Sequence, residues 1–260
     1  MKQIAVLQDL SCFGKCALTV ALPVLSAAGY AVSPLPTAVL SAHTGGLGKP
    51  HVCDLTSDLP PILEHWKTLG LRFDGVYTGY LASPRQAVLA KRLIREFAAE
   101  GAITLCDPAM GDHGKLYSGL PEDMPAAMAR VCACADVIVP NFTEARLLGA
   151  ETAEKLAENF GCRVVLTGAE KDGMLGAEIW DGKESLVLGE RLPGAFHGTG
   201  DLFAAVLLAA LLREKTTAEA ARAAVDFTHD VIAETIRRSR DERFGLCFEP
   251  LLPSLPEYLA

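Results

Sequence analysis

Residues 196–212 constrain the fold of this chain more than any other stretch of the sequence. The segment begins with a glycine-rich turn, in which Gly198, Thr199 and Gly200 precede Asp201. It continues as a helix that is apolar on every side, and such a helix is normally buried. The helix N-terminus carries free amides and the positive end of the dipole. We therefore expect it to open inside the protein and to bind an anion there.

Two interpretations of this turn remain open from the local pattern. A Gly-Thr-Gly-Asp turn is often only a helix cap, in which Thr199 or Asp201 bonds backbone amides. Alternatively, Asp201 acts as a base beside a bound anion. The turn is not a P-loop, and Gly198 and Gly200 lack the third glycine of a dinucleotide fingerprint. The buried helix favours the anion site, because a surface cap does not need a water-free helix behind it.

Length and composition exclude several classes of function. The 260 residues, half of them hydrophobic, suffice for one large α/β domain or two small ones. The net charge of −8 argues against a nucleic-acid or membrane-surface partner. We expect no signal peptide and no membrane span, since the N-terminus reads as a strand and every long apolar run is interrupted. The eight cysteines show no zinc-site spacing, which predicts a reducing cytoplasmic setting.

Short apolar runs alternate with helical periods along the whole chain, which predicts βαβ units around a mostly parallel sheet. We expect strands at 4–7, 31–40, 75–78, 103–106, 137–139 and 163–166, and helices near 15–28, 58–69, 83–100, 121–134, 143–148, 153–159 and 217–240. The prolines of 31–40 predict an irregular or edge strand. Residues 174–180 and 185–188 predict an antiparallel hairpin. Because no linker or repeat interrupts this order, we expect residues 1–260 to form a single domain.

Polar residues follow six of the predicted strands. Because the carboxyl ends of parallel strands meet at one edge of a sheet, these residues are expected to lie close together. They are Gln8, Asp9, Ser11, His43, Thr44, Gly79, Tyr80, Asp107, Asn141, Glu144, Thr167 and Gly168. Helix capping would explain any one of them, but their convergence at one edge favours a site.

Taken together, these segments resemble the ribokinase-like small-molecule kinases, and among them the vitamin B6 (pyridoxal) kinases. The resemblance covers nearly the whole chain, and its motifs lie at Ser11, 41–45, 78–80, 106–112, 140–144 and 198–205. The last motif is specific for the superfamily. The Asp-Pro and Pro-Asn motifs are shared with hydroxymethylpyrimidine kinases, whereas His-Thr-Gly and Thr-Gly-Tyr favour the B6 branch. The resemblance implies a ribokinase-like three-layer α/β/α sandwich.

The resemblance also implies a reaction, the ATP-dependent phosphorylation of the 5′-hydroxymethyl group of pyridoxal, pyridoxine or pyridoxamine. Asp201 would be the base, and the amides of Gly198, Thr199 and Gly200 would stabilise the transferring phosphoryl group. ATP-binding roles are implied for Asp107, Asp112, Tyr117, Asn141, Thr167 and Gly198, substrate-binding roles for Ser11, His43, Thr44 and Tyr80, and metal-binding roles for Asp112 and Glu144. The implied cofactor is Mg²⁺ with ATP, and a K⁺ ion near Tyr117 and Thr167 is left open. The family resemblance suggests a homodimer.

Some of these residues have an equally simple structural explanation. Asp107 precedes a proline and could be a turn former, and Glu144 could be an ordinary first-turn helix acid. His43 could be either a pocket wall or a structural hydrogen-bonding group. Residues 45–50 lack the aromatic side chains that many pyridoxal kinases place over the pyridine ring. The ring cover is therefore expected to be thinner, or to come from Phe13.

Three other functions compete with this interpretation. A hydroxymethylpyrimidine kinase of thiamine synthesis would use the same phosphate machinery with a different ring pocket. A non-catalytic binder of the B6 aldehyde would not need Asp201, Asn141 and Glu144, all of which are present. A nicotinamide-dependent oxidoreductase has little support, because no dinucleotide fingerprint follows the first strand.

Overall fold

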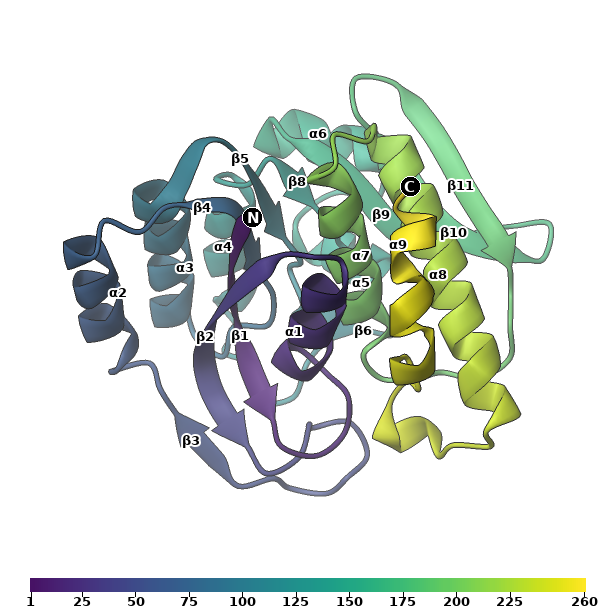
Figure 1. The fold of residues 1–260 in the computed structure, drawn as a ribbon, viewed down its shortest axis with the longest axis horizontal. Helices are drawn as coiled ribbons and strands as arrows, with labels where there is room; N and C mark the ends of the chain where they lie inside the picture. The colour runs from purple at the N-terminus through teal and green to yellow at the C-terminus, as the bar shows by residue number, and fades with distance from the viewer.

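The computed structural model describes residues 1–260. Its strands are β1 (Gln3–Ser11), β2 (Ala31–Leu40), β3 (Val52–Asp54), β4 (Phe73–Thr78), β5 (Ala98–Cys106), β8 (Val137–Ile138), β9 (Arg163–Lys171), β10 (Met174–Trp180) and β11 (Glu184–Glu190). They form a nine-stranded sheet in the order β11-β10-β9-β8-β5-β4-β1-β2-β3 (Figure 1). The central strands pair in parallel, and antiparallel pairing is confined to β3, β10 and β11 at the two sides.

Helices cover both faces of this sheet, as Figure 1 shows. One face carries α1 (Leu18–Ala27), α7 (Thr199–Leu211), α8 (Thr217–Arg237) and α9 (Leu255–Tyr258); the other carries α2 (Leu59–Thr68), α3 (Pro84–Phe97), α4 (Met124–Cys132), α5 (Phe142–Leu147) and α6 (Ala153–Phe160). Alternate residues of a strand face opposite sides, so Val6 joins the first hydrophobic core and Leu7 the second. The expected three-layer α/β/α sandwich is confirmed.

Helix α7 is enclosed as its sequence predicts. Every residue from Leu202 to Leu211 is buried, and the helix packs among α1, α8 and the sheet. Its N-terminus lies at the carboxyl-end edge of the parallel strands, beside the loop that follows β1. No helix in the chain is both long and apolar enough to cross a membrane.

The hairpin of β10 and β11 is confirmed, with Met174 paired to Glu190 and Trp180 to Glu184. The prediction that residues 31–40 form an irregular or edge strand is correct in part. The outer side of Pro34 and Pro36 has no partner strand, and a register shift interrupts the pairing with β1, but β3 pairs with the last residues of β2. That short strand was not predicted, because three residues carry too little pattern.

Two helices end three residues earlier than predicted. Helix α3 ends at Phe97 rather than near residue 100, because Ala98 adopts an extended conformation and begins β5. Helix α8 ends at Arg237 rather than 240, and a 3₁₀ turn, η1 (Glu242–Phe244), follows. Two further features were not predicted. They are a second 3₁₀ helix, η2 (Glu249–Ser254), and a small antiparallel pair of strands, β6 (Gly111–Asp112) and β7 (Lys115–Leu116).

We predict that Leu208→Ala destabilises the protein by about 2–5 kcal/mol, because the fully buried side chain would leave a cavity in α7 packing. The matched control is Leu69→Ala, which truncates a leucine that is 57% exposed. That variant is expected to change stability by no more than about 0.5 kcal/mol. Urea unfolding of both variants measures the difference, and equal losses would contradict the burial of α7.

Candidate active site

The turn before α7 has the geometry of an anion site. Gly198 caps the helix with a φ of +80°, and a Cβ at this position would lie 2.3 Å from the carbonyl oxygen of Lys15. Only glycine fits both conditions. The amides of Thr199, Gly200 and Asp201 donate to no acceptor in the protein. A Cβ on Gly200 would meet no atom within 4 Å, so the turn faces open space.

Asp201 stands at the mouth of this turn and is held from the opposite side by the N-terminus of α1. Its Oδ2 accepts hydrogen bonds from the Ala17 amide at 2.8 Å and the Cys16 thiol at 3.4 Å. The other oxygen, Oδ1, has no protein partner and is not enclosed. Burial raises the pKa of Asp201, against the lowering effect of these two donors. A carboxylate with one fixed and one free oxygen suits a proton acceptor.

Further carboxylates converge on Asp201 from neighbouring strand ends. Burial and the negative charge of Asp201 raise the pKa of Asp9 to about 6. Burial, followed by Glu144 and Asp201, raises the pKa of Asp107 well above its usual range. The carboxylate of Asp107 is buried and has no hydrogen-bond donor. The predicted convergence at the sheet edge is therefore present for these acids, and the cluster lacks a positive charge to balance it.

Asn141 and Glu144 form a reciprocal capping box at the start of α5. The Asn141 Oδ1 accepts from the Glu144 amide, and Glu144 Oε2 accepts from the Asn141 amide, both at 2.9 Å. The Glu144 Oε1 also accepts from the Met110 amide at 3.1 Å, and Asn141 Nδ2 donates to the Gly111 carbonyl. Burial raises the pKa of Glu144 to about 8, although these amides lower it. The structural role of Glu144 is thus real, and a ligand role remains a prediction.

The other predicted nucleotide-side residues lie around these acids. Asp112 is exposed, and its Oδ1 accepts from the amide of His113 at 2.7 Å. Tyr117 is 40% exposed, and its phenol pKa is raised by burial and then by the negative charges of Glu144, Asp107 and Asp112. The Thr167 hydroxyl donates to the Pro140 carbonyl at 3.2 Å, in the middle of β9, where Thr167 also forms a parallel bridge with Asn141.

The four predicted substrate residues divide into two groups. Tyr80 and Thr44 are the two that solvent reaches: Tyr80 is half-buried near Asp9, and Thr44 is exposed. Ser11 is fully buried and donates to Asp9 Oδ2 at 3.2 Å. His43 is buried too, and both of its ring nitrogens are bonded.

His43 has the structural role that the sequence left open. Its Nδ1 accepts from the Gly45 amide at 3.0 Å, so its Nε2 carries the proton that is donated to the carbonyl of Arg243 at 2.6 Å. The amide of Lys15 donates to the Phe244 carbonyl at 3.1 Å, and the Phe13 and Phe244 rings meet edge-on. The η1 turn therefore braces the substrate side of the site.

Sequence reasoning gave no role to Asp9, Cys16 or the η1 turn. Asp9 was noticed as a polar strand end, and its burial beside Asp201 gives it a place in the site. Cys16 looked like one of eight scattered thiols, and nothing in its local pattern pairs it with a residue 185 positions away. The contacts of η1 are equally long-range, so no local signal could have found them.

A magnesium ion fits this edge, provided that the nucleotide supplies ligands. Asp107 is a buried carboxylate without a donor, beside the similarly buried Glu144, and oxygen atoms are the ligands that Mg²⁺ prefers. No group of three His, Cys, Asp or Glu side chains is arranged to hold a metal by itself. Phosphate oxygens and water would therefore complete the coordination.

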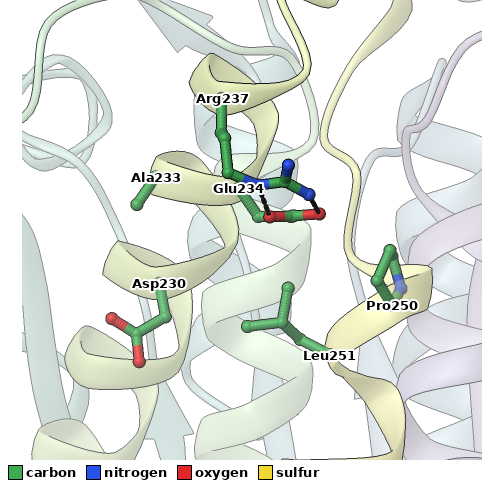
Figure 2. A pocket seen from close by; sticks show the side chains of 6 residues that line it. All are labelled: Asp230, Ala233, Glu234, Arg237, Pro250 and Leu251. Atoms are coloured by element: carbon green, nitrogen blue, oxygen red, sulfur yellow. Dashed lines mark hydrogen bonds and ion pairs between the residues drawn. The ribbon is translucent and has the colours of Figure 1, made fainter.

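A separate hollow of about 440 Å³ lies between α8 and η2 (Figure 2). It is lined by Asp230, Ala233, Glu234, Arg237, Pro250 and Leu251. In Figure 2 Glu234 is paired with Arg237, and the third charged group, Asp230, accepts a hydrogen bond from the Tyr258 hydroxyl. None of the predicted site residues borders it, and it is not a candidate for the active site.

Comparisons with known proteins agree with this geometry. Residues 66–243 match the family model of phosphomethylpyrimidine kinase. Pyridoxal kinase from Lactobacillus plantarum has a TM-score of 0.93 and 35% identity, covering 98% of this chain and 96% of its own. A putative phosphomethylpyrimidine kinase from Bacteroides thetaiotaomicron, solved with pyridoxal, has a TM-score of 0.90 and 33% identity over 98% of this chain and 95% of its own. A putative pyridoxal kinase of Schizosaccharomyces pombe is 27% identical over 91% of this chain and 86% of its own length.

We predict that Gly198→Ala and Gly200→Ala have opposite effects on stability. At Gly198 the left-handed φ and the Lys15 carbonyl make any side chain costly, by about 1–3 kcal/mol. At Gly200 the new methyl group enters open space in a helix, so stability is expected to stay level or rise by up to about 1 kcal/mol.

The same methyl group on Gly200 would stand before the free amides and should weaken Mg·ATP binding. Urea unfolding and calorimetric titration of ATP measure the two properties separately. Unchanged ATP affinity in a stable Gly200→Ala protein would contradict the anion site.

Proposed function

Because the chain belongs to the phosphomethylpyrimidine kinase family, we propose that it is a pyridoxal kinase, which transfers the γ-phosphoryl group of ATP to the 5′-hydroxymethyl group of a B6 vitamer. The observation that carries the proposal is the position of Asp201. Its free Oδ1 stands beside three unpaired helix amides at the edge where Asp107 and Asp9 converge. A kinase for an alcohol needs this pairing of a base with an anion cradle.

The residues divide the reaction between them. Asp201 accepts the proton of the attacking hydroxyl through Oδ1, and its raised pKa brings its basicity closer to neutral pH. The amides of Thr199 and Gly200 donate to the oxygens of the transferring phosphoryl group, where negative charge is concentrated. The helix is already buried and fixed, so this charge is stabilised without reorganisation of the protein.

The magnesium ion would be held by Glu144 and Asp112. It would also offset the charge of the buried Asp107 carboxylate. When bound, Mg²⁺ neutralises phosphate charge and orients the nucleotide. Tyr117, Asn141 and Thr167 would line the nucleotide on the same side. A K⁺ ion beside Thr167 remains part of the proposal.

The pyridine ring would lie on the Tyr80 and Thr44 side, where Asp9 and Phe13 also border the opening. Phe13 is 50% exposed and packs edge-on against Phe244, so an aromatic surface is available despite the glycine-rich loop. Gly46 has a φ of +74°, a conformation that an aromatic residue would adopt only with strain. The cover supplied by Phe13 therefore suits this loop better than an aromatic at Gly46.

A hydroxymethylpyrimidine kinase is the second candidate. The family model is named for a kinase of the related phosphomethylpyrimidine, although the Bacteroides relative with the same description was solved with pyridoxal. A homodimer, a single domain over residues 1–260 and a cytoplasmic location complete the proposal. Eight unpaired cysteines agree with a reducing compartment.

The decisive experiment measures ADP release in a coupled assay with pyridoxal, pyridoxine, pyridoxamine and hydroxymethylpyrimidine side by side. We expect turnover with at least one B6 vitamer at a higher kcat/KM than with the pyrimidine. A preference for hydroxymethylpyrimidine would establish the second candidate. Binding of pyridoxal without any ADP release would indicate a non-catalytic binding protein instead.

We predict that Asp201→Asn lowers kcat by on the order of 10²–10⁴, because an amide cannot accept the hydroxyl proton. The fold should persist, since the amide oxygen of asparagine still accepts from the Ala17 amide. Calorimetric ATP binding serves as the control and should change little. Near-normal turnover in a folded variant would exclude Asp201 as the base.

Asp112→Asn and Glu144→Gln test the metal edge. Asp112 is exposed, so its variant should fold normally and mainly raise the Mg²⁺ concentration needed for half-maximal rate. Glu144→Gln should add a loss of stability of about 1–3 kcal/mol, because both carboxylate oxygens accept backbone amides and an NH₂ group cannot. Initial rates against Mg²⁺ and urea unfolding measure the two effects. A change in vitamer KM alone would contradict the metal assignment.

A further inference from the structure

Asp201 lies between the N-termini of two helices. It belongs to the first turn of α7, and its Oδ2 accepts from Ala17, the N-cap residue of α1, at 2.8 Å. Ala17 is buried and has a φ of +51°, an unusual conformation for alanine that costs of order 1 kcal/mol or more. The chain tolerates this strain at the one residue whose amide points at the carboxylate.

Cys16 is the second hydrogen-bond donor to Oδ2 of Asp201. Its thiol lies 3.4 Å from Asp201 Oδ2, and its backbone is locked by Thr19, whose hydroxyl accepts from the Cys16 amide and donates to the Cys16 carbonyl. Burial and the charges of Asp201 and Asp9 raise the pKa of this thiol well above its usual range. Cys16 is therefore a neutral hydrogen-bond donor and not a thiolate.

We propose that Cys16 is a positioning residue, whose thiol fixes Oδ2 of Asp201 together with the Ala17 amide and leaves Oδ1 directed at the substrate hydroxyl. Both donors fall on one oxygen, which removes the freedom of the carboxylate to rotate about its last bond. Without the thiol, Oδ2 would keep the Ala17 amide as its single donor and would be held less firmly. The role rests on the proposed kinase function, since it concerns the base of that reaction.

The donors also set the basicity of Asp201. A hydrogen bond to a carboxylate favours its charged form, so removal of the thiol donor raises the pKa of the acid. The other titratable groups that face Asp201 are Asp9 from β1, Tyr77 from β4 and Asp107 after β5. A substitution at residue 16 leaves all three residues unchanged, so the comparison of variants reports the effect of the thiol.

The test compares pH profiles of kcat/KM for the wild type, Cys16→Ala, Cys16→Ser and the control Cys134→Ala, which truncates a half-buried thiol on the opposite face of the sheet. Cys16→Ala should move the acid limb to higher pH by about half a unit to one unit. Its kcat should fall about threefold to tenfold below the limb while the vitamer KM changes little. Cys16→Ser, which restores a donor, should move the limb back toward the wild type. An unshifted limb in a folded Cys16→Ala protein overturns the proposal.

A second measurement separates this proposal from the kinase function. Carboxyl ¹³C NMR, assigned with Asp201→Asn, follows the titration of Asp201 directly in the wild type and in Cys16→Ala. A higher midpoint in Cys16→Ala supports the proposal even if no vitamer is phosphorylated, an outcome that would overturn the proposed function alone. Equal midpoints overturn the positioning role even if the kinase is active.

Discussion

The burial of α7 is the constraint on which the rest of the structure depends. Because the helix is apolar on every side, it can exist only between the sheet and the helices α1 and α8. The first turn, residues 199–201, extends out of this core and is only partly buried, and its amides have no partner in the protein, so they face the open side of the site. Gly198 allows the chain to enter the helix past the Lys15 carbonyl. The anion site is therefore a consequence of core packing.

The position of α7 also has an electrostatic cost. Asp9, Asp107, Glu144 and Asp201 gather at the same edge, and burial raises the pKa of each. Carboxylates with raised pKa values favour their protonated forms, so the ligand-free protein loses stability as pH rises from the ordinary carboxyl range through the folded pKa values, which are about 6 for Asp9 and about 8 for Glu144. A bound cation reverses this preference. The proposed magnesium ion would therefore offset the charge that this cluster concentrates at one edge of the sheet.

The sequence predicted those features that have local signals. The succession of βαβ units along the chain, the hairpin and the buried helix follow from periodicity. The grouping of polar strand ends follows from the geometry of parallel sheets. Residues whose role depends on a distant partner could not be assigned. The Cys16 thiol is bonded to Asp201 across 185 positions of sequence, and His43 is bonded to the Arg243 carbonyl across 200 positions. Short elements such as β3 were missed because their pairing, and not their composition, defines them.

The proposed site has a phosphate half and a ring half, and the fold builds these two proposed halves differently. The phosphate half is encoded within single segments, since one turn supplies Gly198, Gly200 and Asp201 and one capping box orients Asn141 with Glu144. The ring half is assembled from the loops after β1 and β2 and from the η1 turn, and these meet only in the folded protein. Substitutions in any of the three loops can therefore alter ring recognition while the phosphate chemistry stays the same.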